Sequence, residues 1–280
     1  MKAIAFSPAH VTGFFEICYD ENDKETGSRG AGICISLGSY AEAEIYGGGD
    51  INIEGNIGKG EVTKEALENL GVKGLKIRIK NELPFSQGFG ISASSTLAAT
   101  LATCHLFNLP EKKAVESSHL AEVKKKTGLG DVVTSYTGGL EIRKEPGIEG
   151  EIEKIECREK LVVAVIGEEM KTKEILRDEK MIERINNVGK ECLKEFLRDK
   201  SLENFFDLSI KFSFETGLAD KKMQKVLNEA NKIGRATMCM LGNSIIAIYS
   251  KEMKKFLKSY QHYECFIDNE GARVLAAFFP

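Results

Sequence analysis

The feature that most constrains the fold is a glycine-rich segment, PFSQGFGISASS from Pro84 to Ser95, which runs directly into the alanine-rich stretch from Thr96 to Leu106. Gly88 and Gly90 let the backbone approach an anion closely, and the first turn of a helix offers N–H donors and the positive end of its dipole. The serine hydroxyls that follow add donors and a candidate Mg²⁺ ligand. The junction therefore predicts a phosphate-binding loop that leads into a helix.

Two commoner phosphate motifs do not fit this segment. A Walker A loop requires a lysine after its second glycine, and no lysine lies between Asn81 and Pro110. The dinucleotide-binding fingerprint requires a third glycine, where this chain has Ala93. The remaining alternative is an ordinary strand-to-helix turn in which Ser92 only caps the helix.

Length and charge favour two domains and a small-molecule partner. A chain of 280 residues exceeds a typical single domain. The turn-rich residues 144–147 and the charged stretch from Glu149 to Lys160 suggest a hairpin and a division into residues 1–157 and 158–280. The net charge of −3, with both signs interspersed, gives no field that would attract nucleic acid or an anionic membrane. The oligomeric state stays open, with a homodimer among the candidates.

The seven cysteines indicate a reducing compartment. They are odd in number and widely spaced, and they never form a C-x-x-C pair, so neither a disulfide framework nor a zinc site is indicated. The N-terminus has no apolar run long enough for a signal peptide or a membrane span. We therefore expect a cytoplasmic protein.

Hydrophobic periodicity predicts a mixed α+β fold, in the form of a two-layer sandwich. Strands are expected at residues 2–6, 32–37, 40–46, 75–79, 161–166, 237–241, 245–249 and 274–279. Helices are expected at 92–106, 111–126, 181–196, 221–233 and 251–259, with Gly128 as the glycine that ends the second of them.

Two acidic residues follow the phosphate loop at positions where phosphoryl transfer would use them. Glu122 lies seven residues after Val115, on the same partly apolar helical face, where a bound Mg²⁺ would neutralise it. Helix statistics alone favour a solvated glutamate paired with Lys125 or Lys126. Asp131 follows Gly-Leu-Gly and, taken alone, is an ordinary N-cap.

The spacing Pro-x-x-x-Gly-x-Gly-x-Ser-Ala at the loop, the acid at Asp131 and the pair Gly138-Gly139 together resemble the motifs of the GHMP small-molecule kinases. That resemblance implies that Asp131 is the catalytic carboxylate, and that Ser92 and Glu122 are the metal ligands. It also implies ATP and Mg²⁺ as cofactors. The ATP-binding residues would be Pro84, Gly88, Phe89, Gly90, Ile91, Ser92, Ala93, Ser94 and Ser95.

Four further segments make the chain most similar to the archaeal pantoate kinases of coenzyme A biosynthesis. They are residues 7–15 (SPAHVTGFF), 26–32 (TGSRGAG), 127–132 (TGLGDV) and 240–243 (MLGN). The resemblance covers the whole chain. It implies an N-terminal domain like ribosomal protein S5, a ferredoxin-like C-terminal domain, and ATP-dependent phosphorylation of pantoate to 4-phosphopantoate. The residues that would bind the substrate are His10, Thr12, Arg29, Gly242 and Asn243.

The residues themselves also indicate how an anionic substrate could be held. Arg29 is framed by glycines and could present a bidentate guanidinium to a carboxylate, with an exposed loop arginine as the alternative. His10 and Thr12 could hydrogen-bond the substrate. The competing functions are a GHMP kinase for homoserine, shikimate or mevalonate, a catalytically silent nucleotide-binding protein, and an RNA-binding S5-like module, which the net charge disfavours.

Overall fold

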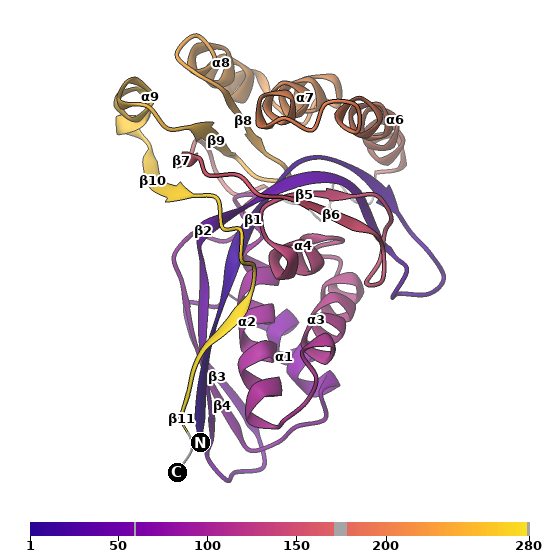
Figure 1. The fold of residues 1–280 in the computed structure, drawn as a ribbon, viewed down its shortest axis with the longest axis vertical. Helices are drawn as coiled ribbons and strands as arrows, with labels where there is room; N and C mark the ends of the chain where they lie inside the picture. Colours follow the sequence, from indigo (N-terminus) through magenta and orange to yellow (C-terminus); the bar gives the residue numbers. More distant parts are fainter. Residues whose placement is uncertain (59, 171–177, 279–280) are drawn as a thin grey trace.

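The computed structural model describes residues 1–58, 60–170 and 178–278, which form two sheets with helices packed on them (Figure 1). The larger sheet contains β1 (Lys2–Cys18), β2 (Gly27–Ile45), β3 (Ile51–Gly55), β4 (Leu75–Asn81), β5 (Leu140–Arg143), β6 (Ile152–Ile155) and β11 (Arg273–Phe278). Its order is β11-β1-β2-β4-β3, and β5 pairs with both β2 and β6. The long antiparallel pair β1 and β2 forms its centre.

Strands β1 and β2 are much longer than the sequence predicted. The prediction was one strand at residues 2–6 and two separate strands on either side of Gly38, where small and polar residues interrupt the apolar pattern. Both strands instead continue through this point. The register shifts between Pro8 and Ala9, near Gly38, and again between Thr12 and Phe14. Such bulges bend a strand without ending it, so β1 and β2 extend as far as the second sheet.

Helices α1 (Glu61–Asn69), α2 (Ile91–Leu106), α3 (Glu111–Lys125) and α4 (Asp131–Thr137) cover one face of the larger sheet (Figure 1). Helix α2 packs on β1 and β2, whose inward side chains there include Ala3, Ala5, Ala41 and Ala43. Small side chains allow the helix to lie close to the sheet. Helices α1 and α3 cover its other side, so nearly every residue of α2 is buried. The N-terminus of α2 is therefore held firmly in place.

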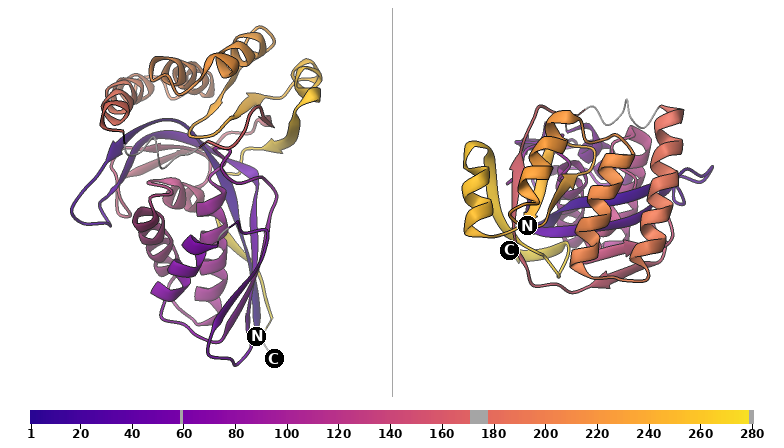
Figure 2. Two further views of the ribbon diagram at one scale, coloured as in Figure 1. Left: turned by 180° about the vertical axis from the view of Figure 1, so that it is seen from behind. Right: turned by 90° about the horizontal axis from the view of Figure 1, so that it is seen from above.

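The smaller sheet contains β7 (Lys160–Val165), β8 (Ala236–Cys239), β9 (Ser244–Ile248) and β10 (Gln261–Phe266), in the order β10-β7-β9-β8. Helices α6 (Glu179–Phe196), α7 (Leu202–Glu215) and α8 (Lys221–Ala230) lie side by side in Figure 2, while α9 (Lys251–Phe256) and the 3₁₀ turn η1 (Leu257–Ser259) precede β10. Phe14 of β1 packs against Phe196 and Phe205, with ring centres 5.6 and 6.1 Å apart. One hydrophobic core therefore joins β1 to the second half of the chain.

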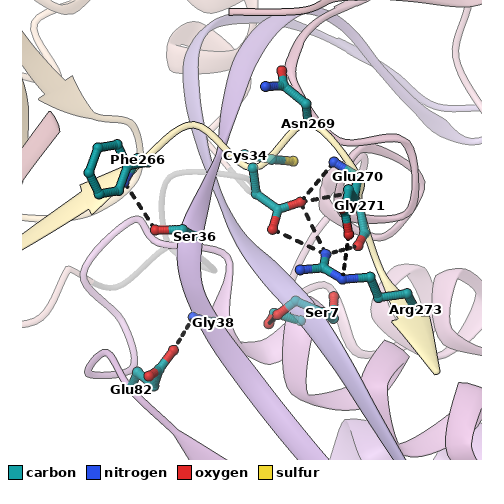
Figure 3. Close-up of polar contacts among 12 residues, drawn as sticks. Ser7, Cys34, Ser36, Gly38, Glu82, Phe266, Asn269, Glu270, Gly271 and Arg273 are labelled. Carbon is teal, nitrogen blue, oxygen red and sulfur yellow. Dashed lines mark hydrogen bonds and ion pairs between the residues drawn. The ribbon is translucent and has the colours of Figure 1, made fainter. Parts of the chain in front are cut away.

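The chain returns to the first sheet at its end. After β10 it crosses back, and β11 pairs with β1 in an antiparallel manner. Figure 3 shows the crossing segment, in which the backbone N–H of Phe266 donates to Ser36 Oγ at 3.0 Å. The Asp268 carboxylate accepts from the backbone of Gly271 at 2.8 Å and from Arg273. The predicted division at 157/158 did not anticipate this return, because a short apolar strand shows no partner in its own sequence.

Most predicted helices and strands are present, with ends shifted by a few residues. The elements that the sequence analysis did not predict are α1, α4, α7, β3 and β10, whereas β5 and β6 form the hairpin suggested around residues 144–147. Helix α3 ends at Lys125 because Lys126 adopts a left-handed conformation with φ of 55°, so the prediction that Gly128 ends it was wrong. Phe279, the last residue of the final predicted strand, lies outside the described residues. Within the described ranges, no helix has the length and apolar character needed to span a bilayer.

Candidate active site

A cleft of about 810 Å³ opens where the glycine-rich loop, the start of α2, and the turn before α4 come together. The loop side contributes Phe85, Ser86, Gly88, Phe89, Gly90, Ile91, Ser92, Ala93 and Ser95. Other segments contribute Thr12, Phe15, Ser28, Glu122, Leu129, Gly130, Asp131, Met240 and Leu241. Residues before and at the start of α1, among them Ile57, Glu61 and Val62, form one end. Three motifs predicted from the sequence thus meet in one cleft.

The backbone of the loop is shaped as an anion site requires. Gly88 and Gly90 have φ of 79° and 61°, a left-handed conformation that side chains rarely adopt. Gly90 is the N-cap of α2 and brings no side chain to cap the helix, so the first-turn residues Ile91, Ser92 and Ala93 line the cleft directly. The N–H groups of this turn and the helix dipole therefore favour a negative charge in the cleft.

Two residues assigned to ATP binding from the sequence do not line the cleft. Ser94 is buried and donates its hydroxyl hydrogen bond toward Ser7 O and Ser39 Oγ, both at 2.8 Å. Its side chain therefore ties α2 to the sheet. Pro84 precedes the cleft-lining part of the loop.

The segment after β8 supports the loop from behind. A Cβ added to Gly242 would lie 2.0 Å from the carbonyl carbon of Gln87 and 2.1 Å from the nitrogen of Gly88. Ser244 Oγ donates to the carbonyl of Gln87. Asn243 Nδ2 donates to Glu168 O at 2.7 Å. Gly242 and Asn243 were expected to bind substrate, but neither lines the cleft, because their contacts are with the loop and with the segment after β7.

Ser92 and Glu122 lie together on the cleft wall. Ser92 Oγ donates to Glu122 Oε1 at 2.5 Å, and Glu122 is only 2% exposed. The alternative of a solvated glutamate is therefore wrong, and Lys125 pairs with Glu65 at 3.4 Å. A hydroxyl and a carboxylate are the hard oxygen donors that Mg²⁺ prefers. No group of three acidic, histidine or cysteine side chains gathers around a metal position in the described part of the chain, so most ligands would have to come from phosphates and water.

Asp131 is the first residue of α4, and Gly130 is the N-cap, so the expectation of an aspartate N-cap was wrong. Its side chain is 27% exposed and lines the cleft. Oδ1 of Asp131 lies 2.7 Å from Nδ1 of His10. Burial alone would raise the pKa of Asp131, but the hydrogen bond and charge of His10, together with the charge of Arg143, hold that pKa below its usual value. The carboxylate is therefore ionised and available as an acceptor.

His10 lies behind Asp131 and is fully buried. Its Nε2 lies 3.0 Å from Oε1 of Glu141, which is also fully buried. Burial alone would lower the pKa of His10, but the hydrogen bonds and charges of the two carboxylates raise it. His10 was expected to contact substrate, and it does not line the cleft because both ring nitrogens already face carboxylates.

Arg143 is a functional candidate that the sequence analysis missed. It is 1% exposed, and Nη1 donates to Glu141 at 2.8 Å. Its Nε and Nη2 have no hydrogen-bond partner within the described part of the chain. A Cβ added to Gly130 would lie 2.5 Å from Ser28 Oγ and 3.3 Å from Arg143 Nε, so these groups surround a backbone segment that lines the cleft. The available signal was the alternation Leu-Glu-Ile-Arg from residue 140, which places two charges on one face of a buried strand.

Arg29 is not in this cleft. Its Nε donates to the carbonyl of Lys144 at 2.9 Å, and its Nη1 lies 3.3 Å from Glu16 Oε2. Successive side chains of a strand point to opposite faces, and the preceding residue, Ser28, is the one that lines the cleft. Thr12, predicted beside His10, does line it.

Comparison with known proteins gives consistent matches. Residues 56–139 match the family model "GHMP kinases N terminal domain". A pantoate kinase of Methanocaldococcus jannaschii is 36% identical, over 88% of this chain and 93% of the relative, and one of Thermococcus kodakarensis is 30% identical, over 89% and 88%. A solved "phosphotransferase related to CoA biosynthesis pathway" has a TM-score of 0.89 at 28% identity and covers 98% of both chains. A mevalonate kinase of Leishmania major shares the fold, with a TM-score of 0.67 at 16% identity over 97% of both chains.

Proposed function

Since the chain belongs to the GHMP kinases, in the family of the archaeal pantoate kinases, we propose that it transfers the γ-phosphoryl group of ATP to the primary hydroxyl of pantoate. The product is 4-phosphopantoate, an intermediate of coenzyme A synthesis. The observation that carries this choice is the buried cation Arg143, whose charge lies behind Gly130 near the Asp131 end of the cleft and would favour an anionic acceptor.

The chemistry of pantoate matches that end of the cleft. Its carboxylate would be attracted by the positive charge of Arg143, which lies behind Gly130 and does not itself line the cleft. Its two methyl groups would contact apolar side chains that line the cleft, such as Phe15, Leu129 and Met240. An acceptor without a carboxylate would gain nothing from that charge.

The nucleotide would lie along the loop. Its phosphates would meet the N–H groups of the first turn of α2, and its base would lie toward the apolar residues Ile57, Val62 and Phe85. Ser92 and Glu122 would hold a Mg²⁺ ion, which neutralises charge on the phosphates when bound.

Asp131 would act on the acceptor. Its carboxylate accepts the hydrogen bond of the attacking hydroxyl, orients the oxygen toward the γ-phosphorus, and receives the proton as the new P–O bond forms. Because the pKa of Asp131 is lowered, positioning of the hydroxyl contributes more than basicity before the transfer. Phosphoryl transfer needs little covalent chemistry from the protein. The backbone N–H groups of the loop would therefore contribute by holding the phosphates in position and stabilising their charge.

We also propose a cytoplasmic location. All seven cysteines lie in the described part of the chain as free thiols, which is the usual state in a reducing compartment.

The test is an assay of the purified protein with Mg-ATP and each of pantoate, homoserine, shikimate and mevalonate, in which the phosphorylated product is identified by mass. We expect product with pantoate, and the variant Asp131→Asn should lose turnover by about 10²-fold or more while retaining ATP affinity. Product only from another acceptor would contradict the assignment. Nucleotide binding without any product would favour the catalytically silent alternative.

A further inference from the structure

A buried network of four charged residues extends from the cleft into the sheet. Asp131 Oδ1 lies 2.7 Å from His10 Nδ1, His10 Nε2 lies 3.0 Å from Glu141 Oε1, and Arg143 Nη1 donates to the same Glu141 oxygen at 2.8 Å. The four residues come from α4, β1 and β5, so the network joins three separate elements. Of the four, only Asp131 lines the cleft.

The donors and acceptors in this network restrict the protonation state of His10. An ionised carboxylate only accepts hydrogen bonds, so an imidazole between two carboxylates satisfies both only when each ring nitrogen carries a proton. The network then contains two negative and two positive groups, and its net charge is zero. Buried charges are tolerated when they are paired in this way. Glu122, Asp268 and Cys34 are further titratable groups close to the network: Glu122 and Asp131 both face Gly128, and Cys34 donates to the backbone of Thr134 at 3.2 Å.

Glu141 controls the state of His10 in this arrangement. With Glu141 ionised, Nε2 donates to it and Nδ1 donates to Asp131. Without that carboxylate the imidazole is neutral, and the single proton that it keeps on Nδ1 makes a weaker hydrogen bond to Asp131 than a charged imidazolium makes. The orientation of Asp131 therefore depends on a residue that contacts neither the cleft nor Asp131.

We propose that Glu141 is a positioning residue: acting through His10, it fixes the Asp131 carboxylate in the orientation that receives the acceptor hydroxyl. The proposal rests on the function proposed above, in which Asp131 acts on the acceptor. The competing explanation is that Glu141 only neutralises Arg143 within the core.

The kinetic test uses the full chain and the variant Glu141→Gln, which keeps size and removes charge. We expect kcat to fall at least about tenfold, while the Kd for ATP stays within about twofold. The decisive comparison adds Glu141→Gln to Asp131→Asn. If Glu141 acts through Asp131, the double variant turns over no more slowly than Asp131→Asn alone. A loss that adds in full to that of Asp131→Asn, or a wild-type kcat in Glu141→Gln, overturns the proposal.

A second measurement does not depend on any substrate. The ring nitrogens of His10 are observed by ¹⁵N NMR and assigned with the variant His10→Gln. We expect both ring nitrogens to be protonated in the wild type and only one in Glu141→Gln, and a singly protonated wild-type ring overturns the proposal. If the wild type does not phosphorylate pantoate, the proposed function fails, and the NMR result still decides the link between Glu141 and His10.

The matched control is Glu153→Gln on the adjacent strand β6, where the carboxylate pairs with Lys144 and Lys200 on the surface. It should leave kcat and the His10 signals unchanged. Should Glu141→Gln fail to fold, as judged by its thermal midpoint, Glu141→Asp keeps the charge with a shorter reach. The kcat of Glu141→Asp should fall by less than tenfold. A wild-type kcat in that variant counts against the proposal.

Discussion

Replacing Gly242 by alanine tests whether the segment after β8 supports the phosphate loop. The added Cβ would lie 2.0 Å from the carbonyl carbon of Gln87 and 2.1 Å from the nitrogen of Gly88. Ordinary contacts between such atoms are about 3.4 Å or longer, so the two backbones must separate by about 1.4 Å. Both partners are main-chain atoms, and no side chain can simply rotate away. The loop is therefore displaced from the position in which it would meet phosphate.

Overpacking of this kind costs about 1 to 3 kcal/mol. If the cost is met by moving the loop, the affinity for ATP falls by about 5- to 150-fold, since each 1.4 kcal/mol corresponds to a factor of ten. Calorimetric titration with ATP and steady-state kinetics would measure this loss directly, and the thermal midpoint would show how much of the cost appears as global destabilisation.

Gly49→Ala is the matched control, because a Cβ there meets no atom within 4 Å and the glycine has no left-handed φ. It should bind ATP as the wild type does. If Gly242→Ala also binds ATP with wild-type affinity and keeps its stability, the reasoning about loop support is refuted.

Three further outcomes are expected. Ser92→Ala and Glu122→Gln should each raise the Mg²⁺ concentration needed for half-maximal activity, and their effects should be non-additive if they hold one ion, whereas independent effects would argue against a shared ion. Arg29→Ala should leave the KM for pantoate within about twofold because its guanidinium pairs with Glu16, and a tenfold increase would restore it as a substrate contact. The raised pKa of His10 stabilises the fold fully below pH 6.5, and that contribution is lost as pH rises through the folded pKa; urea unfolding should show this decline in the wild type and not in His10→Gln.

The elements with strong local signals could be predicted from the sequence. Helix α2 follows a glycine loop, and α6 has a clear apolar stripe, so both were found within a few residues of their ends. Helix α7 was missed although Ser201 caps its N-terminus, because apolar side chains on several sides give its sequence little periodicity. The turn at residues 144–147 indicated the hairpin of β5 and β6, but the pairing of β5 with β2 and of β11 with β1 is set across the sheet, which no local pattern records.

The site was predictable to the extent that its residues carry chemistry within a short motif. Ser92, Glu122 and Asp131 come from separate segments whose motifs resemble those of the GHMP kinases, and all three line the cleft. Glu141 and Arg143 could not be found in this way. A glutamate and an arginine in a short strand are expected on the surface, and only the fold shows that both are buried beside His10.

The same distinction explains why Arg29 attracted attention and Arg143 did not. Glycines around an arginine indicate a backbone that can present it, but they do not say toward which face of the sheet it points. That face is decided by strand register: β5 pairs with β2 so that Arg143 lies opposite Gly30, a residue without a side chain to occupy the space. Glycines in β2 therefore leave room for a cation that comes from another strand. The arginine selected by the fold is the one whose charge also lowers the pKa of Asp131, so recognition of an anionic acceptor and ionisation of the catalytic carboxylate would rest on one buried guanidinium.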